Sequence, residues 1–228
     1  MLITLAFFIG ENTLRVIEPY YEILTPINGK EALQTIEYCA RTCYQSYEKQ
    51  TDDSCYKFVK MLMSRNHESC LEHYSFSVKF VVDRAIQNEI VRHRLSSFCC
   101  ESTRYCSYSK EKFGNEITVI KPPFYKIGTA ELEYWRKSML MAEQAYMFLV
   151  SNSKPEEARC VLPLSLKTEL VMTANIREWR HFLSLRTTPF CHPQMRQITI
   201  PLLQELKSLI PIVFDDINVG EQNDGNNQ

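Results

Sequence analysis

Residues 75–82 alternate between apolar and mostly polar side chains, and this alternation constrains the fold more than any other stretch. The apolar positions are Phe76, Val78, Phe80 and Val82. A period of two places them on one face of a β-strand, which must then cover a hydrophobic core. Asp83 follows directly and is predicted to cap a helix whose inward side chains are Ile86 and Ile90. The sequence therefore predicts a strand joined without a loop to a helix.

A basic stretch, Arg92–Tyr105, follows this helix and reads RHRLSSFCCESTRY. It carries Arg92, Arg94 and Arg104 among short hydroxyl side chains. Guanidinium groups and hydroxyls suit an anion with several oxygens, such as a phosphate or pyrophosphate. A solvated basic loop would have the same composition, so both interpretations stand at this point.

The overall composition limits the possible partners of this stretch. The 228 residues are enough for one sizeable core, and 45% of them are apolar. The formal net charge of −1 argues against a protein that binds mainly nucleic-acid backbone or anionic membrane. Any anion site must depend on a local excess of arginine, and such an excess exists between Arg84 and Lys110.

Nine cysteines are an odd number in a chain that is too large to need disulfides, so reduced thiols in a cytoplasmic protein are expected. We expect no metal site, because no C-x2-C pair exists and Cys39 and Cys43 have no partner pair. The opening MLITLAFFIG lacks a basic start and ends at Glu11, so an edge strand or an extension is expected, not a membrane span.

Periodicity and turn residues predict one α+β domain over residues 1–219 and a disordered acidic tail at 220–228. Asp52 or Asp53 is expected to cap the second helix. Besides the strand and helix above, the expected elements are an extended segment at 14–23, helices at 30–45 and from 54 to near Asn66, a short strand at 117–120, a long helix including 132–149, a short helix from 155, a helical run at 164–174, a helix around 179–183 and a last helix from 193 to 209.

The basic stretch also has a specific spacing, RHR followed by Ser102 and then Arg104-Tyr105. This pattern resembles the signature of the flavin-dependent thymidylate synthases, and the resemblance covers roughly Ala40–Phe214. It implies the fold of that family, a central, mainly antiparallel sheet flanked by helices. It also implies a homotetramer whose active sites join residues from several subunits.

The resemblance implies reductive methylation of dUMP to dTMP. In that family 5,10-methylenetetrahydrofolate provides the carbon, reduced FAD provides the hydride, and NADPH reduces the flavin again. No amino-acid side chain is a two-electron donor, so such a reaction requires a cofactor.

The resemblance also assigns site residues, with Arg186 as the catalytic residue on the uracil ring. The residues implied for dUMP are Glu89, Ile90, Val91, Arg92, Cys100, Glu101, Ser102, Thr103, Arg104, Arg159 and Arg186. Those implied for FAD are Ser69, Arg92, His93, Arg94, Cys100, Asn175, Ile176, Arg177 and His181, with His67 near the folate or nicotinamide. From the residues themselves, His67 and His73 could equally be structural, and Arg180 is expected on a solvated helix face.

The chain departs from the family at Cys100, where Gln or Glu is usual, and at Cys99, where Ser or Asn is common. Cys100 is either a passive replacement or a nucleophile activated by Arg94 or Arg104. Two other functions stay open: a non-catalytic nucleotide- or RNA-binding module, and a family member that binds flavin without turnover.

Overall fold

The computed structural model describes residues 14–220, which divide into two compact units. The α4 unit contains the residues up to Glu18 together with Ser102–Lys167. The sheet unit contains Pro19–Glu101 and the residues from Thr168 onward. The expected edge strand in the first ten residues lies outside the described part of the chain, and so does the expected tail at 220–228 except for Gly220.

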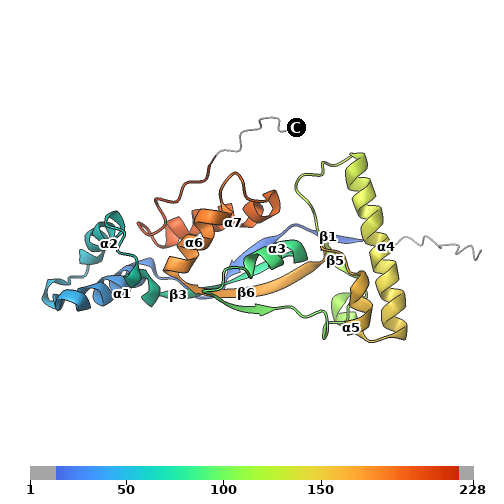
Figure 1. The fold of residues 1–228 in the computed structure, drawn as a ribbon, viewed down its shortest axis with the longest axis horizontal. Helices are drawn as coiled ribbons and strands as arrows, with labels where there is room; N and C mark the ends of the chain where they lie inside the picture. The colour runs from blue at the N-terminus through green and yellow to red at the C-terminus, as the bar shows by residue number, and fades with distance from the viewer. Residues whose placement is uncertain (1–13, 221–228) are drawn as a thin grey trace, which may run out of the picture. The chain divides into compact units, whose positions relative to one another are not determined.

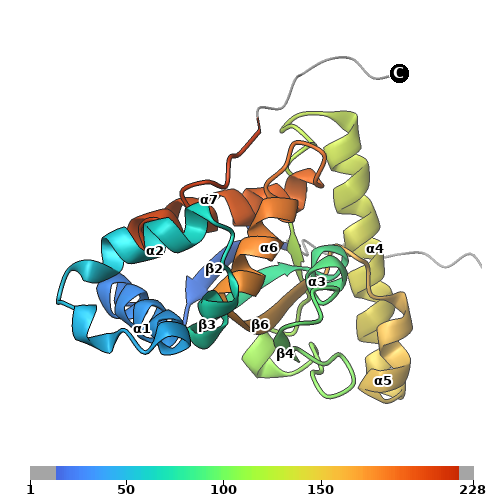
Figure 2. The ribbon, with the colours of Figure 1, turned by 60° about the vertical axis from the view of Figure 1, so that its left-hand side comes forward.

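Four strands form the sheet of the sheet unit, in the order β2 (Tyr20–Ile23), β3 (Ser75–Asp83), β6 (Lys167–Asn175) and β4 (Ser97–Cys100) (Figures 1 and 2). The pairs β2–β3 and β4–β6 are antiparallel. Between β3 and β6, Ser77 lies 2.7 Å from Thr173 and Lys79 lies 2.8 Å from Glu169. As the residue number increases along β3, the residue number of its neighbour on β6 decreases, so this pair is antiparallel too. The expected α+β class with a mainly antiparallel sheet is confirmed.

Strand β3 and the helix after it follow the predicted pattern. The apolar positions of β3 are buried, and its partly polar positions at Ser77 and Lys79 are half-buried. At the end of the strand, the Asp83 carboxylate accepts a hydrogen bond from the Ile86 amide at 2.8 Å and caps α3 (Arg84–Ile90). The strand–cap–helix unit predicted from the sequence is therefore confirmed.

The helical run predicted at residues 164–174 is wrong, because this segment is strand β6. Its side chains alternate strictly between buried and half-buried positions. Thr168 and Ala174 occupy buried positions, whereas the apolar Val171 occupies a half-buried one. A small polar residue inside and an apolar one outside conceal the period of two in the sequence. The Thr168 hydroxyl is satisfied by Gln87, 2.7 Å away.

Helix α6 (Ile176–Arg186) packs on the sheet through Trp179, which is completely buried. The indole stacks on Phe76 of β3, with ring centroids 5.0 Å apart and an interplanar angle of 8°. Its Nε1–H donates to the Phe76 carbonyl at 3.2 Å. Phe80 and Phe182 surround the same indole at 6.3 and 5.8 Å. The expected helix around residues 179–183 is confirmed, and its buried face is aromatic.

Helices α1 (Gly29–Arg41) and α2 (Ser54–Ser64) lie side by side, and α7 (Pro193–Leu209) packs beside α6 (Figures 1 and 2). A Cβ at Gly29 would lie 1.9 Å from the Leu209 carbonyl oxygen, so the close approach of α1 to the end of α7 requires glycine. Asp53 occupies the N-cap position of α2, as expected. Its side chain does not cap the helix but pairs with Lys30 at 3.0 Å.

The α4 unit contains a parallel pair of strands, β1 (Arg15–Ile17) and β5 (Thr118–Ile120), with α4 (Ala130–Asn152) and α5 (Pro155–Ala158). The buried Glu143 of α4 accepts a hydrogen bond from the Ile117 amide at 2.9 Å.

Short 3-10 helices occur in both units, at Thr42–Tyr44, Tyr47–Lys49, Ser69–His73 (η3), Glu111–Phe113 and Arg159–Val161. No helix in the part of the chain that the structure describes is long and apolar enough to cross a membrane.

The packing of α3 generates the first prediction, for Asp83. Its second carboxylate oxygen accepts from Gln194 Nε2 at 2.5 Å, so Asp83→Ala removes a cap and leaves a buried amide without its partner. We expect a loss of about 2 kcal/mol in the free energy of unfolding, measured by urea denaturation. Asp83→Asn is the matched control and should lose much less, because asparagine also caps helices.

The same pair of proteins has a pH dependence of defined sign. Burial raises the pKa of the Asp83 carboxyl, so the folded state binds a proton more readily than the unfolded state. The stability of the parent relative to Asp83→Asn should therefore increase as the pH falls from 7 through the raised pKa. A difference that stays constant or moves the other way would contradict the buried, desolvated position of this carboxylate.

Candidate functional site

The sheet unit contains a cavity of about 1150 Å³, which is large enough for a ligand of dinucleotide size. The loop after α3, the outer face of α6, the region of η3 and the segment after α7 form its walls. The residues that line it are Glu68, Glu72, Arg92, His93, Arg94, Leu95, Asn175, Arg177, Glu178, Arg180, His181, Ser184, Leu185, Arg186, Asp216, Ile217 and Asn218.

Two arginines of the basic stretch provide unneutralised positive charge at the cavity wall. Arg92 and Arg94 are exposed, and neither has an ion-pair partner among residues 14–220. Arg177, in contrast, binds Glu72 at 2.6 Å. Free guanidinium groups beside a large cavity suit the phosphates of a ligand, because each can donate two parallel hydrogen bonds. This geometry favours the anion-site interpretation of the basic stretch over the solvated loop.

Helix α6 presents one face to the core and the other to the cavity. Asn175 caps it, accepting a hydrogen bond from the Glu178 amide at 2.9 Å. His181 and Ser184 follow at helical spacing and line the cavity, whereas Trp179 faces the sheet. The docking of the aromatic face therefore determines where the polar face points.

Arg186, at the last turn of α6, is held by groups from the end of α3. Its NH1 donates to the Glu89 carboxylate at 2.8 Å, and its NH2 donates to the Glu89 carbonyl at 3.3 Å. Its Nε donates to Nε2 of His93 at 3.1 Å. These bonds fix the plane of the guanidinium, while 21% of the side chain stays exposed.

His93 is buried and neutral at physiological pH. Burial lowers its pKa to about 4, and the positive charges of Arg186 and His181 act in the same direction. Because Nε2 accepts from Arg186, the proton lies on Nδ1, which faces Glu178 at 3.5 Å. The imidazole thus orients the guanidinium without adding a second positive charge.

His93, Glu178 and His181 carry potential metal ligands that all lie within 4.8 Å of one another. Nε2 of His93 is already bonded to the Arg186 guanidinium, and a cation beside that group would be repelled. We therefore assign no metal to this cluster.

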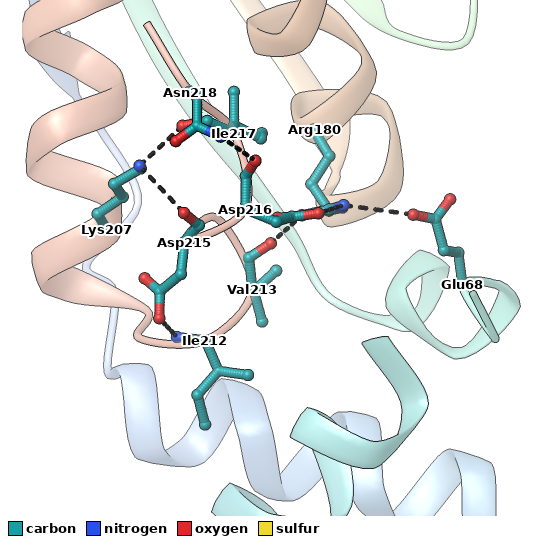
Figure 3. A network of polar contacts seen from close by, with 9 residues as sticks. All are labelled: Glu68, Arg180, Lys207, Ile212, Val213, Asp215, Asp216, Ile217 and Asn218. Carbon is teal, nitrogen blue, oxygen red and sulfur yellow. Dashed lines mark hydrogen bonds and ion pairs between the residues drawn. The ribbon is translucent and has the colours of Figure 1, made fainter. Parts of the chain in front are cut away.

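Arg180 is not on a solvated helix face, and that expectation is wrong. Its side chain is 11% exposed and binds both carboxylate oxygens of Asp216, at 2.6 and 2.8 Å (Figure 3). It also contacts Glu68 at 3.4 Å and the Val213 carbonyl. The partner carboxylate is 36 residues away in sequence, so local periodicity could not show this burial.

The other predicted site residues lie at several places. Ile90 and Ile176 are completely buried, so only their backbones can meet a ligand. His67 lies just before η3 and Ser69 is its first residue, and both are exposed. Apart from the two isoleucines, the predicted residues of the sheet unit that lie outside the cavity lining are His67, Ser69, Glu89, Val91, Cys100 and Glu101. Ser102, Thr103, Arg104 and Arg159 belong to the α4 unit. There, the Ser102 hydroxyl accepts from the Arg104 amide at 3.3 Å, and Arg104 pairs weakly with Glu156 at 3.8 Å.

Cys100 lies on β4, opposite Leu170 of β6, and is exposed. Partial burial of its sulfur raises the pKa of the thiol, and the nearby charge of Arg84 opposes this without reversing it. The thiol is therefore protonated at neutral pH, which disfavours a nucleophile.

Sequence reasoning missed several residues of the cavity wall. Ser184 and Leu185 could have been found, because they follow His181 at helical spacing. Glu68 and Glu72 lie in the segment already singled out around His67. No pattern in the sequence indicated the segment after α7, which contributes Asp216, Ile217 and Asn218.

Comparison with known proteins gives consistent results. Residues 26–212 match the family model of the thymidylate synthase complementing proteins. A flavin-dependent thymidylate synthase of Geobacter sulfurreducens is 30% identical over 189 residues, covering 79% of this chain and 80% of that protein. One of Pyrococcus furiosus is 29% identical over 187 residues, covering 78% and 75%.

A solved structure has a similar fold. The UMP/dUMP methylase PolB of Streptomyces cacaoi, bound with 5-Br dUMP, aligns with a TM-score of 0.73 at 20% identity. The alignment covers 89% of this chain and 96% of that chain. At this identity the likeness shows the shared fold.

The buried position of His93 predicts its protonation behaviour. With only five histidines in the chain, selective ¹⁵N labelling should resolve its imidazole, identified by its loss in His93→Gln. We expect an Nδ1–H tautomer and a midpoint near the pKa of about 4. Since the pKa is depressed by folding, His93 stabilises the fold above its unfolded value of about 6.5, and this contribution is lost as the pH falls towards 4. Titration near pH 6.5 would contradict the assigned bond to Arg186.

Proposed function

Because this chain belongs to the family of flavin-dependent thymidylate synthases, we propose that it methylates dUMP to dTMP. In this proposal 5,10-methylenetetrahydrofolate is the carbon donor, FAD is the bound cofactor and NADPH is the reductant. The observation that carries it is the combination of the family match with a large cavity whose wall has two arginines, Arg92 and Arg94, that have no ion-pair partner in the described part of the chain.

The cavity fits a flavin dinucleotide by size and charge. Arg92 and Arg94 offer donors for the pyrophosphate, and Asn175, Arg177 and His181 line the same cavity from α6. Ile176 contributes backbone only, and Ser69 and Cys100 are proposed at its margin. Bound in its reduced form, FAD would supply the hydride that no side chain can provide. His67 is proposed near the bound folate or nicotinamide.

Each unit, taken by itself, carries residues that we propose to bind the nucleotide. The sheet unit contributes Glu89, Ile90, Val91, Arg92, Cys100, Glu101 and Arg186, and the α4 unit contributes Ser102, Thr103, Arg104 and Arg159. Arg104 and Arg159 are exposed cations suited to the phosphate. We include assembly as a homotetramer with shared active sites in the proposal. The PolB structure, which has 5-Br dUMP bound, supports a uridine nucleotide as substrate.

Arg186 has the role of electrostatic stabiliser. A guanidinium is always protonated in proteins, so it can stabilise negative charge on the pyrimidine but cannot accept a proton. Its bonds to Glu89 and His93 hold it in position before substrate binds. Such preorganised charge costs no reorganisation when the negative charge develops on the ring.

We also propose a cytoplasmic location, which the odd number of cysteines favours.

The proposed function is tested by anaerobic turnover with FAD, NADPH and methylenetetrahydrofolate, following tritium release from dUMP labelled at C5. The purified protein should be yellow, and release should depend on all three additions. UMP labelled in the same way tests discrimination at the sugar. A colourless protein that shifts RNA in a gel would support the binding-module alternative instead.

The position of Arg186 predicts the effect of its removal. Arg186→Ala should lower the turnover rate by roughly 100- to 1000-fold with the fold unchanged, because a preorganised charge is lost and little core volume is removed. Arg186→Lys should recover only part of the rate, since a point charge does not reproduce the planar fork. Arg136→Ala on the surface of α4 is the control and should be neutral. Near-normal turnover of Arg186→Ala would remove this residue from the mechanism.

The raised pKa of the Cys100 thiol predicts that this residue is a passive replacement. Cys100→Ser should turn over at a rate within about threefold of the parent, because no step needs a thiolate. Cys100→Gln, which restores a long polar side chain, should be tolerated. A loss of orders of magnitude in Cys100→Ser at unchanged FAD content, or a 5-fluoro-dUMP adduct on this sulfur, would establish the nucleophile instead.

A further inference from the structure

The segment that follows α7, residues 212–218, forms one wall of the cavity. Asp216, Ile217 and Asn218 line it, together with Arg180 of α6. This wall has no regular secondary structure, so its position depends on side-chain contacts. Val213, Phe214 and Ile217 of this segment pack into the hydrophobic core. Its polar contacts come from two basic side chains, one of α6 and one of α7 (Figure 3).

The first of these basic side chains is Arg180, which is 11% exposed. Its guanidinium forms a bidentate pair with Asp216, donates to the Val213 carbonyl and contacts Glu68 at 3.4 Å. The pair with Arg180 lowers the pKa of the Asp216 carboxyl, so the bond holds over the whole physiological range. One side chain thereby joins three separate parts of the cavity wall: α6, the η3 region and the final segment.

Lys207 of α7 holds the other side of the segment. Its Nζ donates to the carbonyls of Ile217 at 2.8 Å and Asp215 at 3.3 Å. The segment begins in a turn at Ile212, whose φ is 77°. A β-branched residue adopts this conformation only when its surroundings impose it. The Asp215 carboxylate accepts from the Ile212 amide at 3.1 Å and supports this turn.

We propose that Arg180 is a positioning residue for the cofactor, holding residues 212–218 as a wall of the flavin cavity without binding the flavin phosphates itself. The inference rests on the proposed function. The charge of Arg180 is already neutralised by Asp216 and Glu68, whereas Arg92 and Arg94 have no ion-pair partner among the described residues. Three paired arginines also line the cavity, and Arg180 is the least exposed of them, at 11% against 21% for Arg186 and 51% for Arg177. This burial suits a side chain that shapes the wall.

The test removes the charge of Asp216 with little change of shape, as Asp216→Asn. We expect the Kd for FAD, measured by quenching of flavin fluorescence, to rise about tenfold, because one strong bidentate ion pair is lost. The value of kcat at saturating FAD should stay unchanged, since Asp216 makes no bond to Arg186 or to its partners Glu89 and His93. Asp215→Asn is the matched control: it removes the same charge one residue away, and its amide oxygen can still accept from Ile212 N.

Hydrogen exchange provides a readout that does not depend on flavin. In the apoprotein, Asp216→Asn should accelerate amide exchange at residues 212–218 and leave β3 and α6 unchanged. Arg180→Met should give both effects at least as strongly, because it also removes the contacts to Glu68 and the Val213 carbonyl. The double variant should be no worse than Arg180→Met, because the pair with Asp216 is already lost there.

Each outcome decides between the alternatives. If Asp216→Asn binds FAD as tightly as the parent, or more tightly because Arg180 is released to bind the anion, the positioning role is overturned. A uniform rise in exchange and a lower Tm at unchanged FAD affinity would show a merely structural pair. If the parent itself binds no FAD, the proposed function fails and the flavin part of this inference with it, whereas the exchange data still report on the wall.

Discussion

The stacking of Trp179 on Phe76 is the interaction on which the rest of the sheet unit depends. It attaches α6 to β3 through an aromatic pair 5.0 Å apart and a hydrogen bond from the indole to the strand backbone. Aromatic pairs of this kind add to the large apolar area that each ring buries. Because a helix is rigid, fixing this one face also fixes the opposite face, which carries Arg177, His181 and Ser184. Core packing thus sets the geometry of the cavity.

Arg92 and Arg94 can lie in the cavity wall because most other basic groups nearby are neutral or paired with carboxylates, which limits repulsion between positive charges. His93 lies beside Arg186 as a neutral imidazole, since burial and that guanidinium together lower its pKa to about 4. Arg177 is neutralised by Glu72 of η3, and Arg180 is neutralised by Asp216 of the segment after α7. Within residues 14–220, positive charge without an ion-pair partner is then left at Arg92 and Arg94, where an anionic ligand would replace the missing counter-charge.

How much of this was predictable depended on whether the deciding contacts were local. The alternation at residues 75–82 and the cap at Asp83 are local patterns, and both were found. Strand β6 was missed because Thr168 is buried, and its hydroxyl is satisfied by Gln87, far away in the sequence. The role of Arg180 was missed for the same reason, since its carboxylate partner comes 36 residues later. The basic stretch could be predicted as a site, because its spacing is a linear pattern, and Arg92 and Arg94 of this stretch line the cavity.

The two halves of the candidate site arise from one construction used twice. A strand ends at a polar residue that caps the next helix: β3 at Asp83 before α3, and β6 at Asn175 before α6. Because β3 and β6 are neighbours in the sheet, the two helices start from adjacent strands. The bonds from Arg186 to Glu89 then join the last turn of α6 to the last turn of α3. The proposed catalytic guanidinium is therefore placed by the register of two strands and two caps, which explains how residues nearly a hundred positions apart in sequence share one site.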